Sequence, residues 1–179
     1  MKKDSQTFLI WFTGISGSGK TTLSKKLYNT LKKKYKMKLK LIDGDDFRKK
    51  NNFHKYNHYS RKIVSEKKRA YGIELQSKNY NVIISGITAK KSVRLKNRSK
   101  IKNYIEVFLK CPFKICLKRS KIKMNRFNKS NIIGATRNNE YNEHKEVEIK
   151  IDTNKTSPTQ GLKKILKYLR KKNFIKSKN

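Results

Sequence analysis

The sequence is short of acidic residues. Only 12 of its 179 residues are Asp or Glu, against 48 that are Lys or Arg, so the formal net charge is +36. Such an excess favours anionic partners, for example nucleotides, nucleic acids or acidic membranes. The basic residues are spread along the chain rather than gathered in one block, which favours a genome-wide compositional bias over a dedicated binding tail. Charge alone therefore indicates no particular partner.

Cysteines and long apolar runs are also scarce. Cys111 and Cys116 are too few for a disulfide framework, and their spacing fits no common zinc pattern. We expect them to be buried thiols in a reducing compartment. No apolar run approaches membrane-spanning length, and residues 1–4 lead into a short apolar strand rather than a signal peptide. These features predict a cytoplasmic protein without membrane contact.

The most informative stretch is an apolar run followed by a glycine-rich turn. Gly14, Gly19, Lys20 and Thr21 fit the phosphate-loop pattern G-x-x-x-x-G-K-[ST]. Glycines let several backbone N–H groups point at one phosphate, and the N-terminus of the next helix adds favourable partial charge. The alternative, an ordinary Gly/Ser turn, does not account for all four fixed positions between a strand and a helix. The residues predicted to bind nucleotide phosphates and Mg²⁺ are Gly14, Ser16, Gly17, Ser18, Gly19, Lys20, Thr21 and Thr22.

Strand patterns alternate with amphipathic helical patterns along the chain. We predict strands over 7–13, 38–43, 81–85, 104–109 and 147–152. We predict helices over 20–34, 61–78, 89–101 and 113–119, and a last helix that begins at Ser157-Pro158. This alternation predicts a single domain over 1–179, an α/β fold with a central five-stranded parallel sheet between two helical layers.

Three segments depart from this alternation. Residues 45–59 are polar and aromatic with no clear period, and we interpret them as a substrate-facing loop with a short helical turn. Residues 120–145 form a long polar stretch, which we interpret as a lid over a nucleotide site. Residues 171–179 are predicted to be a frayed basic tail.

Ligands bind at the carboxyl ends of strands in such a sheet. The second predicted strand ends at Asp43, and Asp45 and Arg48 follow closely. Phosphoryl transfer needs a carboxylate that holds Mg²⁺ or accepts the proton of the acceptor hydroxyl, and arginine suits an anionic acceptor. The alternative is an Asp-Gly turn whose carboxylates cap nearby N–H groups. Because three aspartates gather at one strand end of an acid-poor chain, we favour a phosphoryl-transfer site.

Two motifs of other nucleotide-binding proteins are missing from the sequence. The third predicted strand ends at Ser85-Gly86, without the acid that motor ATPases and GTPases usually need there. Asn154-Lys155 continues as Thr156-Ser157 and so lacks the guanine-reading pattern N-K-x-D. Both features favour a small-molecule kinase over a switch or a motor.

Four segments together resemble the adenylylsulfate kinase family: residues 14–22, 41–48, 105–119 and 151–158. Their order and spacing cover nearly the whole chain, and the D-G-D-x-x-R element at 43–48 is the most specific. The resemblance implies a three-layer α/β/α P-loop nucleotide kinase fold. It also implies transfer of the ATP γ-phosphoryl group to the 3′-hydroxyl of adenosine 5′-phosphosulfate, the step of sulfate activation that yields 3′-phosphoadenylylsulfate.

The same resemblance implies roles for individual residues. Lys20 and Asp43 are the implied catalytic residues, and Thr21 and Asp43 the implied Mg²⁺ ligands. Arg119 and Thr153 are implied to lie near the adenine of ATP. The residues implied to bind the acceptor are Asp45, Arg48, Arg61, Ile87 and Thr88.

Most departures from the family pattern lie on the acceptor side. Asp46 stands where the family has Asn, and either Arg61 or Lys62 takes the place of a family arginine. Val64 or Ser65 replaces an Asn that contacts the acceptor. A kinase that acts on another nucleotide-linked acceptor, such as a surface-glycan precursor, therefore remains an alternative.

A nucleic-acid-binding P-loop protein is the alternative from another class, although no recognised RNA- or DNA-binding module is present. We expect a small-molecule nucleotide acceptor as the partner and leave a homodimer open.

Overall fold

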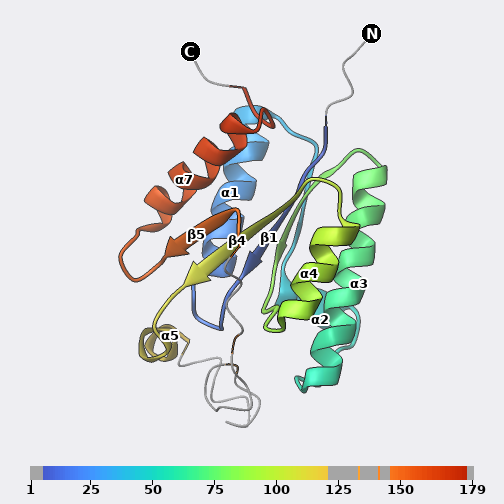
Figure 1. Cartoon of the computed structure of the whole chain (residues 1–179), viewed down its shortest axis with the longest axis vertical. Coiled ribbons are helices and arrows are strands. Elements are labelled where there is room, and N and C mark those ends of the chain that lie inside the picture. The colour runs from blue at the N-terminus through green and yellow to red at the C-terminus, as the bar shows by residue number, and fades with distance from the viewer. Residues whose placement is uncertain (1–5, 121–132, 134–140, 142–145, 177–179) are drawn as a thin grey trace.

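The computed structural model describes residues 6–120, 133, 141 and 146–176. Its centre is one sheet of five strands, in the order β2-β3-β1-β4-β5 (Figure 1). All four neighbouring pairs are parallel, which confirms the predicted parallel sheet. The strands are β1 Leu9–Thr13, β2 Leu39–Ile42, β3 Asn81–Ser85, β4 Tyr104–Lys110 and β5 Ile149–Asp152.

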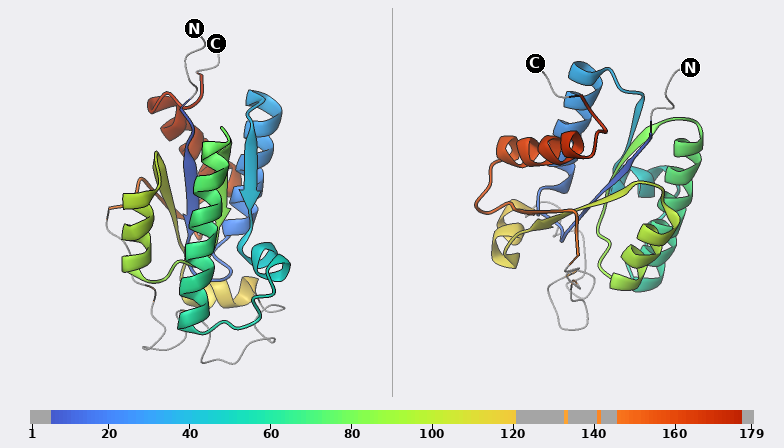
Figure 2. Two further views of the ribbon diagram at one scale, coloured as in Figure 1. Left: turned by 90° about the vertical axis from the view of Figure 1, so that its right-hand side faces the viewer. Right: turned by 45° about the horizontal axis from the view of Figure 1, so that its top comes forward.

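Helices cover both faces of the sheet (Figures 1 and 2). α1 (Lys20–Tyr35) and α7 (Pro158–Lys171) lie on one face, and α3 (His58–Ser77) and α4 (Lys91–Lys100) lie on the other. The short helices α2 (Gly44–Lys50) and α5 (Phe113–Arg119) follow the carboxyl ends of β2 and β4. The three-layer α/β/α architecture predicted from the sequence is therefore confirmed.

The central strand β1 is completely buried because it contributes to a core on each face of the sheet. Ile10 and Phe12 pack in one cluster with Leu27 of α1 and with residues of α7. Leu9 and Trp11 pack in the other cluster, which includes Leu75 of α3. Each such side chain contributes roughly 1.5–3 kcal/mol by leaving water. The glycine-rich turn therefore follows a strand that is firmly held on both sides.

Residues 45–59 are more regular than the sequence predicts. Asp43 caps α2, because its side chain accepts a hydrogen bond from the Asp45 N–H, and Asn57 caps α3 in the same way through the Ser60 N–H. α2 therefore spans most of the first half of the predicted loop, and α3 begins earlier than predicted. Short polar helices carry no apolar period, so caps rather than periodicity stabilise them.

The predicted frayed tail packs on the core through Phe174 and Ile175. Lys171 ends α7, and beyond it Ile175 is buried in the core. Phe174 meets Phe8 edge-on, with 5.2 Å between ring centroids. The fraying prediction is therefore wrong for Phe174 and Ile175, while 177–179 lie outside the described residues.

The predicted lid over 120–145 falls almost entirely outside the described residues, which include only Ser120, Ile133 and Tyr141 of it. Within the part of the chain that the structure describes, no helix is both long and apolar enough to cross a bilayer.

Candidate active site

A pocket of about 820 Å³ lies where the carboxyl ends of the strands meet. The glycine-rich loop, the start of α2, one face of α3, the segment after β3, the end of α5 and the start of α7 line it. Most of the predicted site residues are brought together here. Those that line the pocket are Ser16, Gly17, Gly19, Lys20, Thr21, Thr22, Asp43, Asp45, Arg48, Arg61, Ile87, Arg119 and Thr153.

The glycine-rich loop has a conformation that side chains would disturb. Gly17 and Gly19 have φ values of 78° and 90°, in the left-handed region that favours glycine. A Cβ on Gly17 would also collide with the carbonyl group of Cys116. Gly19 caps α1 without a side-chain hydrogen bond, so the first turn of the helix presents N–H groups that a phosphate can accept. The loop is therefore shaped as a phosphate cradle.

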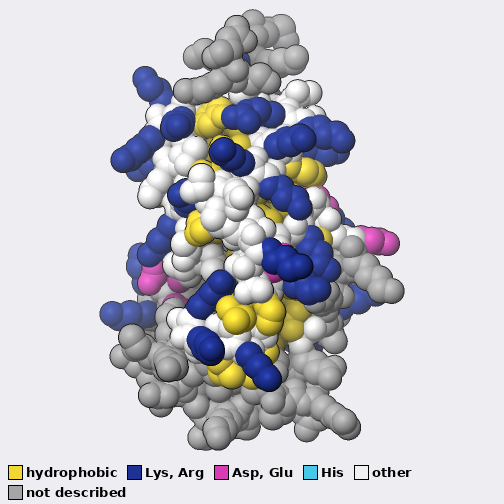
Figure 3. Space-filling view, turned by 90° about the vertical axis from the view of Figure 1, so that its left-hand side faces the viewer, with side chains coloured by type: hydrophobic (Ala, Val, Ile, Leu, Met, Phe, Trp, Pro, Cys, Tyr) yellow, Lys and Arg dark blue, Asp and Glu magenta, His cyan; other side chains and the backbone are white. Residues whose placement is uncertain are grey.

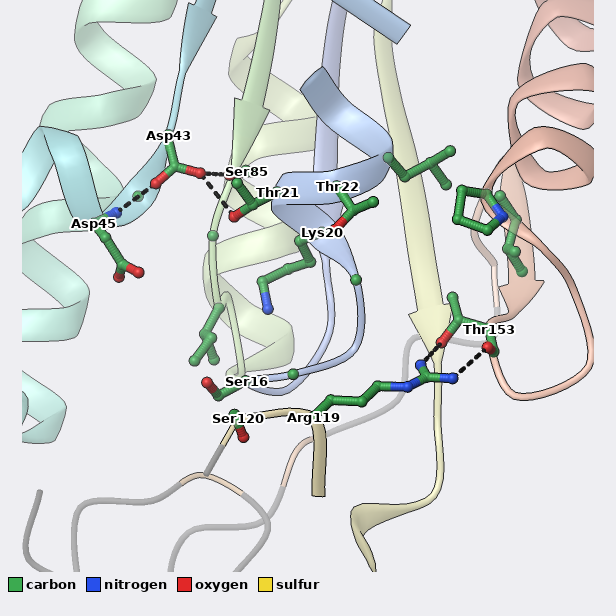
Figure 4. A pocket seen from close by; sticks show the side chains of 18 of the residues that line it. Ser16, Lys20, Thr21, Thr22, Asp43, Asp45, Ser85, Arg119, Ser120 and Thr153 are labelled. Carbon is green, nitrogen blue, oxygen red and sulfur yellow. Dashed lines mark hydrogen bonds between the residues drawn. The ribbon is translucent and has the colours of Figure 1, made fainter. Parts of the chain in front are cut away.

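Lys20 lies at the end of this loop. Its Nζ donates a hydrogen bond to the Ile15 carbonyl oxygen across 2.7 Å. The contact holds the ammonium group over the loop and toward the pocket (Figure 4). This position suits a lysine that contacts the outer phosphates of a nucleotide.

Asp43 connects the phosphate loop to the far side of the pocket. Its Oδ2 accepts hydrogen bonds from the hydroxyl groups of Thr21 and Ser85 at 2.9 and 2.8 Å, and its Oδ1 accepts one from the Asp45 N–H at 3.0 Å (Figure 4). Burial by itself would raise the pKa of Asp43, but these hydrogen bonds outweigh it and hold the pKa below its usual value. The carboxylate is therefore ionised at neutral pH.

Thr21 and Asp43 form the pair that could hold Mg²⁺. Among the described residues no group of three or more His, Cys, Asp or Glu side chains is placed to bind a metal. Mg²⁺ commonly takes one or two protein ligands and completes its shell with phosphate oxygens and water. A hydroxyl and an adjacent carboxylate beside a phosphate cradle fit that requirement.

Two arginines and a tyrosine form the wall beyond Asp45. Arg48 donates to the Lys55 carbonyl oxygen at 2.8 Å, and its guanidinium carbon lies 4.4 Å from the centre of the Tyr56 ring. Arg61 donates through Nε to the Tyr56 carbonyl oxygen at 2.6 Å. Burial, followed by the nearby charge of Arg48, lowers the pKa of Arg61 to about 10. The guanidinium carbons of Arg48 and Arg61 lie 4.4 and 5.9 Å from the centre of the same Tyr56 ring. Two neighbouring cations of this kind favour the binding of an anion.

The two basic candidates at the start of α3 lie in different places. Arg61 lines the pocket, whereas Lys62 is exposed on the helix surface. Arg61 is therefore the residue available to an acceptor.

The opposite end of the pocket brings Arg119 and Thr153 together, as predicted. The guanidinium group of Arg119 donates to the Thr153 hydroxyl at 3.3 Å and to the Thr153 carbonyl oxygen at 3.0 Å (Figure 4). Leu23, Ile151 and Pro158 line this end with apolar surface. A planar cation beside apolar side chains is a suitable surface for a nucleotide base.

Three predicted residues do not line the pocket. Gly14 and Ser18 are buried beneath the loop and shape it from behind. Thr88 is 2% exposed, and its hydroxyl accepts a hydrogen bond from the indole N–H of Trp11 at 3.0 Å. A buried indole N–H needs such a partner, so the hydroxyl of Thr88 satisfies a donor inside the core. The prediction that Thr88 binds substrate is therefore not supported by its position, whereas its neighbour Ile87 reaches the pocket.

Among the lining residues that reasoning from the sequence missed, three lie near Asp43 or the two arginines. Ser85 was predicted to end the third strand, but its hydrogen bond to Asp43 could not be predicted because it depends on the order of the strands in the sheet. Tyr56 lies between two arginines only after α2 and α3 have packed. Lys68 of α3 lines the pocket although it is buried, and in a chain so rich in lysine no sequence signal distinguished it.

Comparisons with known proteins agree with this geometry. Residues 6–152 match the family model described as adenylylsulphate kinase. The cytidine diphosphoramidate kinase of Campylobacter jejuni is 35% identical over 104 residues, which are 58% of this chain and 61% of that protein. The probable adenylyl-sulfate kinase of Archaeoglobus fulgidus is 30% identical over 158 residues, 83% of this chain and 97% of that one.

Solved structures show the same fold. The APS kinase of Mycobacterium tuberculosis, solved in complex with AMPPNP and APS, has a TM-score of 0.82 at 19% identity, over 92% of this chain and 98% of that one. The shikimate kinase of Aquifex aeolicus has a TM-score of 0.58 at 23% identity, over 93% and 98%. The phosphate loop, the Asp43 cluster and the match over residues 6–152 lead to one assignment. The chain belongs to the adenylylsulphate kinase family and is a nucleotide kinase with a P-loop fold.

Proposed function

We propose that this protein transfers the γ-phosphoryl group of ATP to a hydroxyl group of a nucleotide-linked acceptor. The observation that carries the proposal is the position of Asp43. Its carboxylate contacts Thr21 of the phosphate loop on one side and the start of α2 on the other. α2 carries Arg48 into the same pocket. A donor site and an anion-binding acceptor site thus meet at one carboxylate.

The residues divide the chemistry between them. Lys20 would neutralise the β- and γ-phosphates, and the phosphate loop would orient them for in-line transfer. Thr21 and Asp43 would hold Mg²⁺, which would neutralise negative charge on the phosphates. Because hydrogen bonds lower the pKa of Asp43, its carboxylate is a weak proton acceptor. We therefore assign Asp43 the role of binding the metal and orienting the substrates, in preference to that of a general base.

Adenosine 5′-phosphosulfate is the first candidate acceptor. The family model carries that activity in its name, and so does the Archaeoglobus relative. Under this assignment the product is 3′-phosphoadenylylsulfate and the pathway is sulfate activation. ATP and Mg²⁺ are the expected donor and metal.

Cytidine diphosphoramidate is the second candidate. It is named for the Campylobacter relative, whose matched segment is 35% identical. The apolar Val64 on the pocket wall, at or next to the position of an asparagine in the family pattern, also favours a different acceptor. Both candidates carry two linked anionic groups next to a nucleoside, and Arg48 and Arg61 suit either of them.

A coupled ADP-release assay tests the proposal. ATP and Mg²⁺ are combined with adenosine 5′-phosphosulfate, cytidine diphosphoramidate, AMP, CMP or no acceptor, and the product is identified by mass. We expect acceptor-dependent ADP release with one phosphosulfate or diphosphoramidate compound, and none from a Lys20→Ala control purified in parallel. Acceptor-independent ATP hydrolysis at the same rate, or equal activity of the control, would contradict the proposal.

The net charge gives little support to a nucleic-acid-binding role. Figure 3 shows one face of the molecule, on which the Lys and Arg side chains of the described residues are scattered rather than gathered in one groove. A salt titration with a random oligonucleotide separates the two functions, because steep salt dependence with submicromolar affinity would favour nucleic acid.

The assembly and the compartment remain proposals. An APS kinase of Thiobacillus denitrificans is described as hexameric, so we keep a homo-oligomer as the expected assembly. The free thiols Cys111 and Cys116 fit a reducing cytoplasm.

A further inference from the structure

Lys68 is a buried lysine on the acceptor side of the pocket. Its side chain is 3% exposed, yet it lines the pocket together with Asp43, Gly44 and Gly86. Among the described residues none accepts a hydrogen bond from its Nζ. The contact it does make is with the Trp11 ring, whose centre lies 5.3 Å away. Burying an ammonium group without an acceptor is costly, so a purely structural role explains this lysine poorly.

The backbone leaves room for this ammonium group. A Cβ on Gly86 would collide with Lys68 Nζ, and a Cβ on Gly44 would lie 3.7 Å from it. Gly86 follows β3 and Gly44 begins α2, so the Nζ lies where these two segments meet. That place is next to the segment that carries Asp43. The lysine is therefore directed at the site where donor and acceptor meet.

The charged groups around Lys68 do not neutralise its positive charge. Asp43 and Asp45 attract the ammonium group, while Arg48 and Lys20 repel it. Asp43 already accepts three hydrogen bonds. Burial, followed by the charge of Arg48, lowers the pKa of Lys68 to about 8. An added anion would relieve both the burial cost and the repulsion.

We propose, on the basis of the function proposed above, that Lys68 binds the anionic linkage of the acceptor together with Arg48 and Arg61. The acceptor class is then a nucleotide with two linked anionic groups, such as a phosphosulfate or a diphosphate. Val64 and Ser65, the neighbouring residues of α3 that line the pocket, carry no charge. Lys68 thus adds a second charged contact on this helix, beside Arg61, and it determines acceptor specificity.

Replacement of one lysine on the same helix provides the kinetic test. Lys68→Met keeps the length and removes the charge, and Lys62→Met makes the same change at an exposed position of α3. We expect Lys68→Met to raise the acceptor KM by roughly tenfold or more and to leave the KM for ATP within about threefold. Lys62→Met should match the wild type. An unchanged acceptor KM in Lys68→Met would overturn the proposal.

Thermal unfolding separates a binding role from a structural one. Removing a buried charge that has no acceptor should leave the melting temperature of Lys68→Met equal to that of the wild type or higher. A lower melting temperature together with an unchanged acceptor KM would assign Lys68 to the structure instead.

The pH dependence of the wild type gives a test that needs no variant. The charged groups that face Lys68 are Lys20 of α1, Asp43 before α2, and Asp45 and Arg48 of α2. Burial, followed by the charge of Arg48, lowers the pKa of Lys68 to about 8. The value of kcat/KM for the acceptor should therefore fall as the pH rises through about 8. A profile that stays flat from pH 6.5 to 10 would overturn the proposal.

A binding measurement distinguishes failure of this inference from failure of the proposed function. Trp11 is the single tryptophan of the chain and contacts Lys68, so its fluorescence reports on the ammonium group. With ADP saturating the phosphate loop, pyrophosphate should change the Trp11 emission saturably in the wild type and in Lys62→Met but not in Lys68→Met. If no acceptor is phosphorylated but this pattern holds, the kinase proposal fails and the anion site stands. If pyrophosphate affects Lys68→Met equally, the anion site fails.

Discussion

Asp43→Asn removes one charge from the centre of the pocket and almost nothing else. The side chain keeps its size, and asparagine is as good a helix cap as aspartate, so Oδ1 can still accept from the Asp45 N–H. The amide nitrogen that replaces Oδ2 cannot accept hydrogen bonds from the hydroxyl groups of Thr21 and Ser85, which approach within 2.9 and 2.8 Å. The hydroxyl groups can rotate and accept from the amide instead. The fold should therefore tolerate the change.

The effect on catalysis should be much larger. A carboxylate that holds Mg²⁺ or orients the acceptor hydroxyl acts chiefly on the transition state, where removal of one such group costs roughly 2.7 kcal/mol or more. That energy corresponds to a loss of about 100-fold or more in kcat. The KM values for ATP and for the acceptor should change only modestly, because Lys20, Arg48 and Arg61 still bind both substrates.

Steady-state kinetics with the best acceptor measure this effect, and circular dichroism measures the melting temperature. Asp46→Asn is the matched control, because Asp46 belongs to the same turn of α2 but is exposed and does not line the pocket. We expect Asp46→Asn to retain wild-type kcat. If Asp43→Asn kept kcat within a few-fold and raised only KM, Asp43 would be a binding residue, and the assigned role would be refuted.

Three further predictions follow from the same geometry. Lys20→Ala should abolish phosphoryl transfer with little change in melting temperature, and near-normal turnover would contradict the kinase assignment. Arg48→Ala should raise the acceptor KM roughly tenfold, about 1.4 kcal/mol, and spare ATP; the reverse pattern would place the acceptor elsewhere. Lys68 has a pKa of about 8 in the fold and about 10.4 unfolded, so the unfolded chain binds more protons between these values. Stability relative to Lys68→Met should therefore rise with pH by roughly 3 kcal/mol over that window, as denaturant melts at pH 7.5 and 10.5 would measure.

The sheet and the donor site could be predicted because their signals are local. The apolar run before Gly14 and the spacing from Gly14 to Thr21 specify a buried strand, a tight turn and a helix start without reference to the rest of the chain. Asp43 follows from the same reasoning, since strand ends of a parallel sheet gather at one edge.

The remaining features depend on contacts between distant segments. Thr88 was misplaced because the indole N–H that needs its hydroxyl lies 77 residues away, on β1. The tail after Lys171 looked exposed because two apolar residues among basic ones show no pattern, although Phe174 and Ile175 pack on the core. Lys68 could not be predicted from the sequence, because it is one of 48 basic residues and no pattern distinguishes a buried lysine among them.

The donor and acceptor halves of the pocket bind their ligands through different parts of the chain. Donor binding rests largely on backbone geometry, because N–H groups of a glycine loop face the phosphates and the loop follows a strand buried on both sides. Under the proposed function, acceptor binding rests on side chains of α2 and α3 that face the pocket. Replacing Arg48 or Lys68 should therefore alter acceptor binding and leave the donor site intact. Family membership accordingly identifies the nucleotide kinase chemistry, while under our proposal the side chains on α2 and α3 determine which molecule receives the phosphate.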